Sequence, residues 1–535
     1  MNRIPARRFV AAAVFLLTFA YFVCLNERAP WVLDDYPQIV QNPTLHSMRS
    51  IPGFFTGRVQ DSVRGESFAG DIYRPFFLLS LLSDYQLFGP NPRAFHIHND
   101  ILHALNVLLL FLLALRFVPI WGAVLASAVF AFHPIVIEAV TWISARTDLL
   151  AMLFALLHLH AAVRIADPGT TASLKPWWLL YGATIPLGLY SKETFAPIPI
   201  LAPLALGLTA HADAGVRRRL LSCLGVSLAL LIPALAWRGH IVHRDVPLLD
   251  PVIFKNCVTL SKRFIELLVL PGRSAFLRLY EHVTFVPSRD LVPFFAHACG
   301  WLLVVAASWR RRLPMMGAGL ILGCLLPVAL ILDMSTWIGE RFFYIPLAGI
   351  SLLVSALVAA LLSSSRVHVS AFTRRTVIAG LSLWVILLSV QTVARSGDWS
   401  TEARLYRSVL EQDPSNYWAY YQLSVDSHRR GDAESETRNL RDALNLRPDY
   451  LPALNNLAVY SIQRRDFSQA RDLLERSLKA APKRPKTAFN YGYYFESKGD
   501  FRQALAWYRK ALEFDPGYEK AAEALRRLEK TSGSP

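Results

Sequence analysis

Cysteine is scarce in this sequence, and the few cysteines are not arranged for chemistry. The 535 residues include five cysteines, of which Cys24, Cys223, Cys299 and Cys324 fall in or beside apolar segments. The sequence contains no Cys-x-x-Cys pair and no run in which cysteine and histidine cluster. It therefore indicates neither a disulfide framework nor a zinc site.

Nucleotide-binding loops are also missing from the sequence. It has no Walker loop and no G-x-G-x-x-G element, so ATP-driven transport finds no support within this chain. A long basic run interleaved with aromatic residues is missing too, although the formal net charge is +16. Nucleic acid is therefore excluded as a partner. We interpret the positive charge as a sign of membrane topology, with membrane lipids and phosphate as the expected partners.

Charged residues are few compared with apolar ones. Only 18% of the residues are charged, whereas 53% are hydrophobic, which is too apolar for an ordinary soluble globule. At the start of the chain, Arg3, Arg7 and Arg8 precede an apolar stretch that begins at Phe9. A cleaved signal sequence would carry a small-x-small site before Asn26, which is not evident, so an uncleaved membrane anchor is favoured.

Hydropathy and loop charge predict about eleven membrane spans and an all-α, polytopic transmembrane bundle. With the N-terminus in the cytoplasm, the basic clusters 217–219, 310–312 and 374–375 all fall on the cytoplasmic side. The active site and the segment after Arg395 are then extracytoplasmic. The predicted spans lie near residues 9–25, 97–115, 117–134, 149–165, 177–190, 194–210, 220–237, 291–308, 313–332, 345–362 and 376–394.

Two further segments are apolar but unsuited to a full span. Segment 76–88 would be about 20 Å long as a helix, which is shorter than a bilayer core, and its polar residues favour a helix at the membrane interface. Region 259–290 has a short apolar stretch interrupted by Pro271 and Gly272, which suggests a re-entrant or membrane-resting segment.

The last part of the chain has a 34-residue period, which is marked by Pro414, Pro448, Pro482 and Pro516. This is the length of a tetratricopeptide repeat, in which two helices form a hairpin and successive hairpins stack. The period predicts an α-solenoid domain at 397–535 after a membrane domain at 1–396. The repeats fall near 417–450, 451–484 and 485–518. Such a stack presents a concave surface suited to a peptide, although a structural spacer or a dimerisation arm would explain the repeats as well.

Asp34 and Asp35 lie shortly after the first predicted span and are the candidates for catalysis. A carboxylate held just outside the membrane could take a proton from an acceptor hydroxyl while a lipid-borne donor is attacked. Paired acids in a loop are also commonly solvated, or cap a helix, and the sequence alone does not distinguish these interpretations.

More ionisable residues gather on the predicted outer side. Such residues at the ends of apolar helices generally face protein or a polar cavity, because exposure to lipid is costly. A histidine at a helix end can simply cap it, Arg146 and Asp148 can pair with each other, and basic side chains extend to the interface in many membrane proteins. The candidates are Arg74, His96, His133, Glu138, Arg146, Asp148, Lys192, Glu340 and Arg341.

A family resemblance rests on short motifs that occur in order along the chain. These are LDD after the first span, YRP, FHIHNDILHAL, HPIVIEAV followed by SARTDLL, then YSKE and ERFFYIP. Together with the repeats, they resemble the transmembrane and tetratricopeptide repeat-containing proteins. Those are lipid-linked-sugar glycosyltransferases of the C-type membrane fold, related to the protein O-mannosyltransferases. This chain departs from the animal members of that family in having only three or four repeats.

The resemblance implies transfer of a sugar, by analogy mannose, from a polyprenyl-phosphate donor to a hydroxyl of a protein acceptor. Asp34 or Asp35 is then the base of an inverting displacement. Arg341, Arg146, Arg74 and Lys192, in that order, become candidates for the donor phosphate, because Arg can grip two phosphate oxygens. His96, His133 and Glu138 could orient the donor sugar or the base. A divalent metal is possible, and phosphate neutralisation by Arg would make it unnecessary.

Three other functions remain open at this point. The chain could be a non-enzymatic scaffold in which the membrane domain anchors repeats that recruit envelope proteins. It could be a transporter or flippase, although its polar groups gather at one face rather than at mid-membrane. It could also be a glycosyltransferase whose acceptor is a lipid or a polysaccharide.

Overall fold

The computed structural model describes residues 3–57, 73–169, 173–209, 214–241, 252–271, 287–309, 311–331, 339–363 and 370–532. Within these ranges the chain is all-α, with no strand. It divides into two compact units, Met1–Thr401 and Glu402–Pro535, which are called here the membrane unit and the repeat unit.

Each of the eleven predicted spans falls on a helix of the membrane unit. Eight of these helices in the described ranges are long and apolar enough to cross a membrane. The other three, α5, α8 and α9, have 13, 15 and 12 residues. The chain is an integral membrane protein. The helices are α1 (Arg3–Asn26), α4 (Pro92–Ala114), α5 (Ile120–Phe132), α7 (Arg146–Ile165), α8 (Lys175–Leu189), α9 (Ile198–Thr209), α10 (Ala214–Ile241), α12 (Pro287–Ser308), α13 (Arg312–Ile331), α14 (Tyr344–Leu362) and α15 (Ala371–Asp398).

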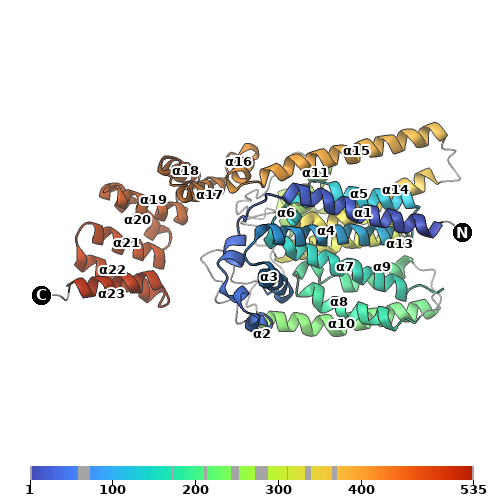
Figure 1. Cartoon of the computed structure of the whole chain (residues 1–535), viewed down its shortest axis with the longest axis horizontal. Coiled ribbons are helices and arrows are strands. Elements are labelled where there is room, and N and C mark those ends of the chain that lie inside the picture. The colour runs from blue at the N-terminus through green and yellow to red at the C-terminus, as the bar shows by residue number, and fades with distance from the viewer. Residues whose placement is uncertain are drawn as a thin grey trace. The chain divides into compact units, whose positions relative to one another are not determined.

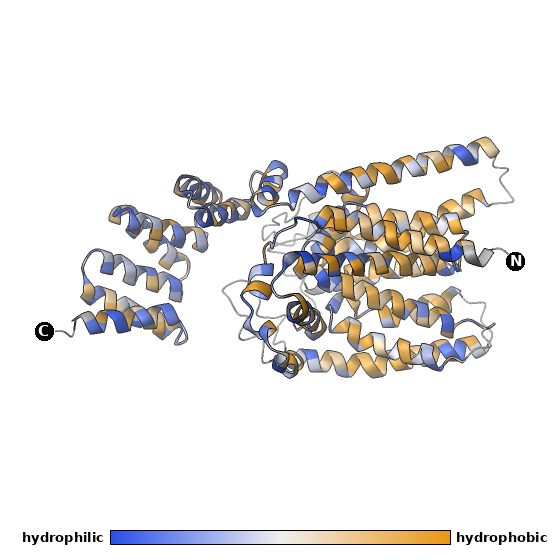
Figure 2. Ribbon diagram, viewed as in Figure 1, coloured by the Kyte–Doolittle hydropathy of each residue, from blue (hydrophilic) through white to orange (hydrophobic). Residues whose placement is uncertain are grey.

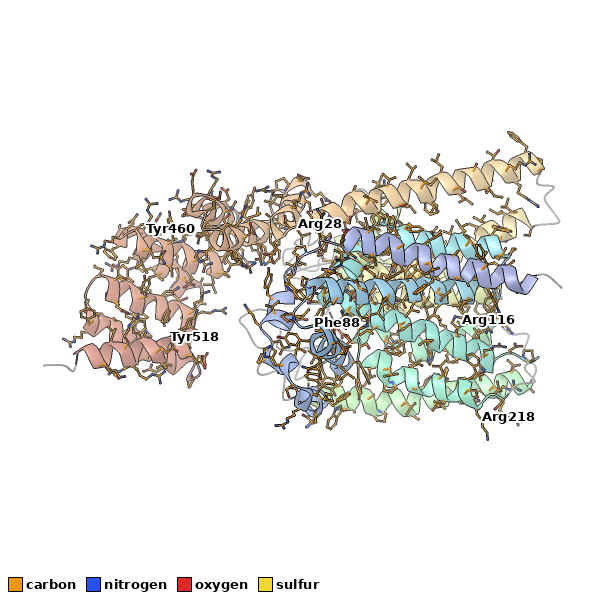
Figure 3. All side chains as sticks on the ribbon, in the orientation of Figure 1. Arg28, Phe88, Arg116, Arg218, Tyr460 and Tyr518 are labelled. Atoms are coloured by element: carbon orange, nitrogen blue, oxygen red, sulfur yellow. The ribbon has the colours of Figure 1, made fainter. Side chains whose placement is uncertain are left out.

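These helices run side by side and share two common ends (Figure 1). Apolar residues cover their length and polar residues gather at the ends (Figure 2). Arg116 and Arg218 lie at the end where the chain starts, whereas Arg28 and Phe88 lie at the other end (Figure 3). Both arginines at the first end lie in or beside loops that the charge pattern predicts to be on the same side of the membrane. The second end is called here the site end.

Shorter elements close the site end of the bundle. They are η1 (Tyr36–Val40), η2 (Pro43–His46), η3 (Met48–Ser50), α2 (Ile51–Thr56), α3 (Pro75–Phe88), α6 (Val136–Thr141), η5 (Ile143–Ala145), η6 (Glu193–Phe195) and η8 (Glu340–Phe343). Ile39, Phe54, Phe77 and Leu81 pack with Phe95 of α4 in one buried cluster. This cluster fixes the first outer loop against the bundle.

The structure gives two outcomes for the segments that were too short to span. The helix predicted at 76–88 is present as α3, and its position at the interface stays a prediction. In region 259–290, the helix α11 (Val252–Val269) extends over the first part. Residues 272–286 lie outside the described residues.

The repeat unit consists of stacked helical hairpins. Its helices are α16 (Glu402–Gln412), α17 (Tyr417–Arg429), α18 (Ala433–Leu446), α19 (Leu451–Gln463), α20 (Phe467–Ala480), α21 (Pro485–Ser497), α22 (Phe501–Phe514) and α23 (Glu519–Ser532). The two units join after Thr401, and α15 extends past residue 396.

The turns inside the hairpins recur with the same geometry. Gly431, Arg465 and Gly499 all have left-handed backbones, with φ of 72°, 61° and 83°. The aspartate that follows each of them caps the next helix by accepting a backbone N–H bond at 3.0 Å. These caps satisfy amide groups that a helix start leaves unpaired, so the turn and the cap together fix the period.

Close backbone contact between α13 and α14 provides a test of the bundle. A Cβ added at Gly317 would stand 2.7 Å from the carbonyl oxygen of Gly349, whereas one added at Gly319 would meet nothing within 4 Å. We expect Gly317→Ala to destabilise the protein by about 1–3 kcal/mol because the two helix backbones must separate. Gly319→Ala, on the same helix, is the control and should leave the thermal unfolding temperature in detergent nearly unchanged. Equal unfolding temperatures for both variants would contradict this packing.

Candidate active site

Asp34 and Asp35 lie on a strained turn between α1 and η1. Leu33, directly before them, has φ of 53°, a left-handed conformation that non-glycine residues rarely adopt. The two carboxylates have different surroundings. Asp35 is fully buried, whereas Asp34 is half-buried. Strain of this kind persists only where the surrounding structure holds it, and it is common at functional sites.

Asp35 holds the turn against the rest of the bundle. Its Oδ1 accepts hydrogen bonds from the backbone N–H of Ser144 at 2.9 Å and from the Ser144 hydroxyl at 2.6 Å. Its Oδ2 accepts the backbone N–H of Val32 at 3.1 Å. With both oxygens engaged and no exposed surface, Asp35 is suited to positioning its neighbour rather than to meeting a substrate.

Burial also changes the acidity of both carboxyls. It raises the pKa of Asp35 to about 7, because the three hydrogen bonds only partly offset the loss of solvent. It raises the pKa of Asp34 as well, and the positive charge of Arg341 opposes that rise. A carboxylate with a raised pKa is a better proton acceptor than an ordinary one, which suits a general base.

The Asp35 pKa predicts a dependence of stability on pH. Between the ordinary value near 4 and about 7, the folded state keeps a proton on Asp35 that the unfolded state has lost. Stability should therefore fall as pH rises through this window and stay level above it. From pH 5 to pH 7 the loss is about 2–3 kcal/mol, at about 1.4 kcal/mol per pKa unit. Thermal unfolding of the wild type and of Asp35→Asn across this range checks it. If the two curves run parallel, Asp35 is not the titrating group.

Arg341 lies on η8 and faces Glu138 of α6. Its guanidinium pairs with Glu138, whose other oxygen accepts the backbone N–H of Glu340 at 2.5 Å. The guanidinium also stands over the ring of Trp142 at 4.6 Å. Glu138 is fully buried, whereas the Arg341 side chain is 21% exposed. Arg341 is therefore fixed by its contacts with Glu138 and Trp142, while part of its side chain remains exposed.

Glycine is required next to this pair. A Cβ at Gly339 would stand 2.5 Å from Glu138 Oε1 and 2.6 Å from Arg341 Nη1.

The residue before Arg341 is held by α15. Glu340 accepts a hydrogen bond from Arg395 at 3.4 Å, and Arg395 pairs with Asp398 at 2.7 Å. The end of α15 thus supports η8.

Arg146 does not pair with Asp148, which was one interpretation of these neighbours. It is fully buried and pairs with Asp84 of α3 at 2.6 Å. Its Nε donates to Asn99 Oδ1 at 2.7 Å. Residues two positions apart on a helix point to nearly opposite sides, so Arg146 faces α3 while Asp148 faces Lys192, just before η6. Arg146 therefore joins α3 to α4 and α7.

Lys192 and Asp148 form the second buried ion pair. The ammonium lies 2.6 Å from each Asp148 oxygen, and both side chains are 3% exposed. The same ammonium is 5.0 Å from the centre of the Phe342 ring. Phe342 directly follows Arg341, so this pair supports η8 from the α7 side.

Arg74 lies before α3 and pairs with Glu193 of η6. Its Nη2 is 2.7 Å and its Nε is 3.2 Å from the two carboxylate oxygens. Arg238 of α10 approaches the same carboxylate at 3.7 Å. Two guanidinium groups therefore share one carboxylate at this point of the site end.

The two histidine candidates are both buried. His133 follows α5, and its Nδ1 accepts the backbone N–H of Ile135 at 3.2 Å, as expected for a histidine at a helix end. His96 lies in α4 beside the backbone of Ala29 and Pro30, which begin the loop that leads to the aspartates. These positions connect both histidines to the backbone around the site.

Some residues of this cluster carried no clear signal in the sequence. Asp84 is a single acid in an apolar segment, and a charge on a buried helix face is the only pattern that could have marked it. Trp142 and Trp399 lie face to face with ring centres 6.5 Å apart, although more than 250 positions separate them. No local pattern predicts such a contact.

A divalent metal ion stays a prediction. In the described ranges, no group of three or more His, Cys, Asp or Glu side chains could hold one.

Comparison with known proteins gives matches over both units. Residues 75–237 match the family described as dolichyl-phosphate-mannose-protein mannosyltransferase, and residues 485–518 match a tetratricopeptide repeat family. Protein O-mannosyl-transferase F38B6.6 of Caenorhabditis elegans is 24% identical over 77% of this chain and 58% of its own length. Protein O-mannosyl-transferase TMTC4 of Mus musculus is 25% identical over 78% of this chain and 63% of its own length. The resemblance to the transmembrane and tetratricopeptide repeat-containing family is confirmed.

The chain spans about three fifths of the length of these two relatives of the family. Among solved structures, one similar to this chain is that of ArnT from Cupriavidus metallidurans bound to undecaprenyl phosphate. The alignment covers 79% of this chain and 81% of ArnT, with 15% identity and a TM-score of 0.39. The mannosyltransferase match includes His96, Glu138 and Lys192 but neither Asp34 nor Arg341. The roles of those two residues therefore rest on their geometry in this chain.

Proposed function

We propose that this protein transfers a sugar, by family analogy mannose, from a polyprenyl-phosphate donor to a Ser or Thr hydroxyl of a protein acceptor. The observation that carries the proposal is the half-buried Asp34, which is held on a strained turn within the field of Arg341. A proton acceptor and an anion-binding group are the two groups that this reaction needs. The names of the relatives support the same chemistry.

In the proposed step, the Asp34 carboxylate takes the proton of the acceptor hydroxyl. The hydroxyl oxygen forms a bond to the anomeric carbon of the sugar while the bond from that carbon to the phosphate oxygen breaks. The electron pair leaves with the polyprenyl phosphate, so negative charge grows on the phosphate. Attack from the face opposite the leaving group inverts the anomeric configuration.

Arg341 is the best placed of the basic residues to receive that charge. Lys192 and Arg146 are buried in ion pairs, and a phosphate would have to displace Asp148 or Asp84 to reach them. Arg341 has an exposed side and aromatic rings behind it, which hold its orientation. A fixed guanidinium in a site poor in water stabilises developing charge by several kcal/mol. Arg74, which is 17% exposed, is the second candidate.

The same proposal includes an orientation in the membrane. Arg116 and Arg218 lie at the end where the chain starts, and basic loops favour the cytoplasm (Figure 3). Asp34 and Arg341 belong to elements at the opposite end, which would be extracytoplasmic. Labelling of inserted tags with a membrane-impermeant reagent checks this orientation. We expect a tag after residue 28 to be labelled and a tag at residue 218 to be protected.

The proposed function is tested by an assay of the purified protein with radiolabelled polyprenyl-phosphate sugars. We expect transfer from the mannosyl donor to a Ser- and Thr-containing peptide, and an inverted linkage in the product. Parallel reactions with EDTA and with added Mg²⁺ or Mn²⁺ measure any need for a metal. Transfer only to a lipid or polysaccharide would replace the acceptor, and no transfer from any donor of the panel would refute the enzyme.

Arg341→Lys separates the geometry of this residue from its charge. Lysine keeps the charge and loses the planar group that lies against Trp142 and reaches two oxygens. We expect the rate of transfer to fall by about 10²-fold, in line with loss of one well-placed donor to the developing anion. Arg375→Lys, on a predicted cytoplasmic segment, is the matched control and should leave the rate unchanged. A normal rate for Arg341→Lys would remove this residue from the mechanism.

A further inference from the structure

The end of the bundle where the chain starts carries a second group of arginines, which the proposed reaction does not use. They are Arg116, two residues after the end of α4, Arg164, in the last turn of α7, and Arg219 of α10. These three residues are called here the inner arginine cluster. Arg116 and Arg218, the neighbour of Arg219, mark this end of the bundle in Figure 3. The loop charges predict that it faces the cytoplasm.

Helix packing brings the members of the cluster together. His160 lies one turn before Arg164 on the same face of α7, and its Nε2 donates to the carbonyl oxygen of Leu109 of α4 at 2.9 Å. The ends of α4 and α7 therefore emerge side by side. Arg219 Nη1 donates to the Asp167 carbonyl oxygen at 3.3 Å, which joins α10 to the end of α7. Three helices thus converge where the cluster lies.

Arg164 has a fixed orientation and no acid partner. Its guanidinium lies over the ring of Trp177 of α8, 5.5 Å from the ring centre. Its Nε is enclosed by protein and has no hydrogen-bond partner among the residues that the structure describes. An aromatic ring against a guanidinium limits the directions in which its N–H groups can point. Arg164 therefore presents a positive charge in a defined place.

Arg116 adds a second positive charge beside the first. Partial loss of solvent and the charge of Arg164 lower the pKa of the Arg116 guanidinium, whereas the charge of Asp167 opposes this change. The Asp167 carboxylate accepts the backbone N–H of Gly169 at 3.1 Å. Within the described ranges, neither Arg116 nor Arg164 comes within ion-pair distance of an acid. With Asp167 counted against three arginines, the cluster keeps an excess of positive charge.

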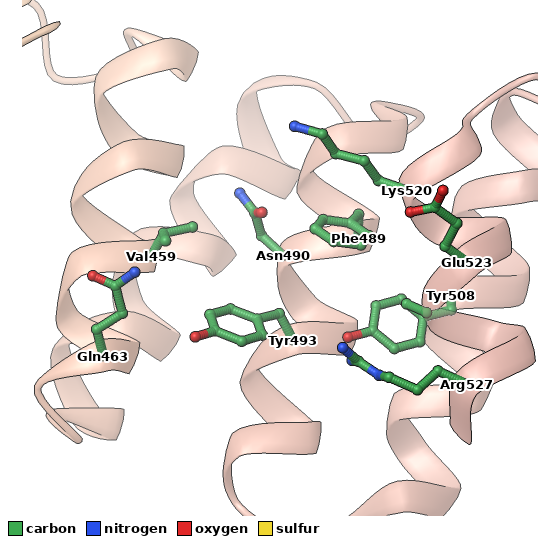
Figure 4. Close-up of a pocket in the computed structure, with 10 residues that line it drawn as sticks. Val459, Gln463, Phe489, Asn490, Tyr493, Tyr508, Lys520, Glu523 and Arg527 are labelled. Atoms are coloured by element: carbon green, nitrogen blue, oxygen red, sulfur yellow. The ribbon is translucent and has the colours of Figure 1, made fainter. Parts of the chain in front are cut away.

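Arginines at other places in the chain are neutralised by acids. Arg341 pairs with Glu138 in the membrane unit. In the pocket between α19, α21 and α23 of the repeat unit, Arg527 lies beside Tyr508 (Figure 4) and pairs with Glu496 at 2.6 Å. Two like charges that are held together at a membrane surface repel each other, and they favour an anion between them. The inner arginine cluster is therefore suited to an anion from outside the chain.

Apolar surface next to the cluster favours a lipid over a free anion. Leu112, four positions before Arg116 on α4, is 36% exposed, and Leu179, two positions after Trp177 on α8, is 75% exposed. Exposed leucines on membrane helices face acyl chains. A lipid phosphate also offers oxygens that two guanidinium groups can bind, and basic pockets between membrane helices on the cytoplasmic side commonly hold anionic headgroups.

We propose that the inner arginine cluster binds the phosphodiester group of an anionic phospholipid in the cytoplasmic leaflet. Arg116 and Arg164 hold the phosphate oxygens. The acyl chains lie along the bundle beside Leu112 and Leu179. Because such a lipid binds only the folded protein, it stabilises the packing of α4, α7 and α8. The cluster lies at the opposite end of the bundle from Asp34, so this inference does not depend on the proposed sugar transfer.

Native mass spectrometry, which counts bound lipids, tests the inference. The full-length protein in a neutral detergent is titrated with dioleoyl phosphatidylglycerol or with dioleoyl phosphatidylcholine, which has the same acyl chains and a neutral headgroup. We expect one phosphatidylglycerol to bind about 10–30-fold more tightly, because each of two basic residues favours an anionic lipid about fivefold. Equal affinity for the two lipids would overturn the inference. Displacement of the lipid by millimolar inorganic phosphate would also overturn it, in favour of a free anion.

Matched variants locate the bound lipid. Arg116→Gln, at an exposed position, should weaken phosphatidylglycerol binding about fivefold, and Arg164→Gln should do the same. Thermal unfolding without added lipid shows whether Arg164→Gln remains folded. Arg375→Gln removes the same charge from the start of α15, on the same predicted side of the membrane, and should leave the Kd unchanged. Wild-type affinity in Arg116→Gln, or an equal loss of affinity in Arg375→Gln, would show that the arginines form no specific site.

Discussion

Asp34→Asn should lower the rate of sugar transfer by about 10²–10⁴-fold, the usual contribution of a general base. Asparagine has the same shape as aspartate, and Asp34 is half-buried rather than central to the packing. The protein should therefore express and unfold as the wild type does. The measurement is single-turnover transfer from a radiolabelled donor, because it isolates the chemical step from binding and product release.

The pH dependence of the remaining activity adds a second readout. If Asp34 is the base, the wild-type rate should fall as pH drops through the raised pKa of its carboxyl. This fall is the acidic limb of the pH–rate profile, and the variant should lack it. Arg341 opposes the rise in that pKa, so Arg341→Gln should move the limb to higher pH. A variant that kept both the wild-type rate and the acidic limb would remove Asp34 from the reaction.

A neighbouring acid provides the matched control. Glu27 also follows α1, and its side chain is 56% exposed with only a distant partner, Arg93 at 4.0 Å. Glu27→Gln removes the same charge from the same loop and should leave the rate unchanged. Asp35→Asn differs from both, because it disturbs the anchor to Ser144. We expect it to lower activity together with stability, whereas Asp34→Asn should lower activity alone.

The sequence predicts those parts of the fold that depend on a pattern of residues close together in the chain. Each of the eleven apolar segments forms a helix, because a helix pairs most of the backbone polar groups of an apolar segment with one another. The 34-residue spacing of the prolines predicted the helical hairpins, and in the structure each hairpin turn has a left-handed residue followed by an aspartate that caps the next helix. Both signals lie in the sequence itself, so no tertiary contact is needed to read them.

The site was harder to predict because its contacts join distant segments. The sequence marks Asp34 and Asp35 equally, and only the bonds from Ser144 and Val32 distinguish a buried anchor from a half-buried base. In the same way, Arg146 was next to one acid in sequence and paired with another in space. Partners of buried charges depend on which helix faces which, and that is decided by packing of the whole bundle.

The ion pair of Asp148 and Lys192 gives the second large effect. Asp148→Asn leaves the buried Lys192 ammonium without its partner, and breaking such a pair from one side usually costs about 3–5 kcal/mol. The double variant Asp148→Leu, Lys192→Met replaces both charges with apolar groups of similar size. Replacements of this kind are often neutral in stability, so we expect an unfolding temperature in detergent close to that of the wild type.

The stable double variant then decides what Lys192 does. If the lysine only supports Phe342 and, through it, Arg341, the KM for the lipid-linked donor should stay within about threefold of the wild type, because methionine can fill the same space beside the ring. A tenfold rise in that KM, in a variant that unfolds normally, would instead assign Lys192 to the donor phosphate. Lys486→Met, in the repeat unit, controls for loss of a lysine charge elsewhere in the chain.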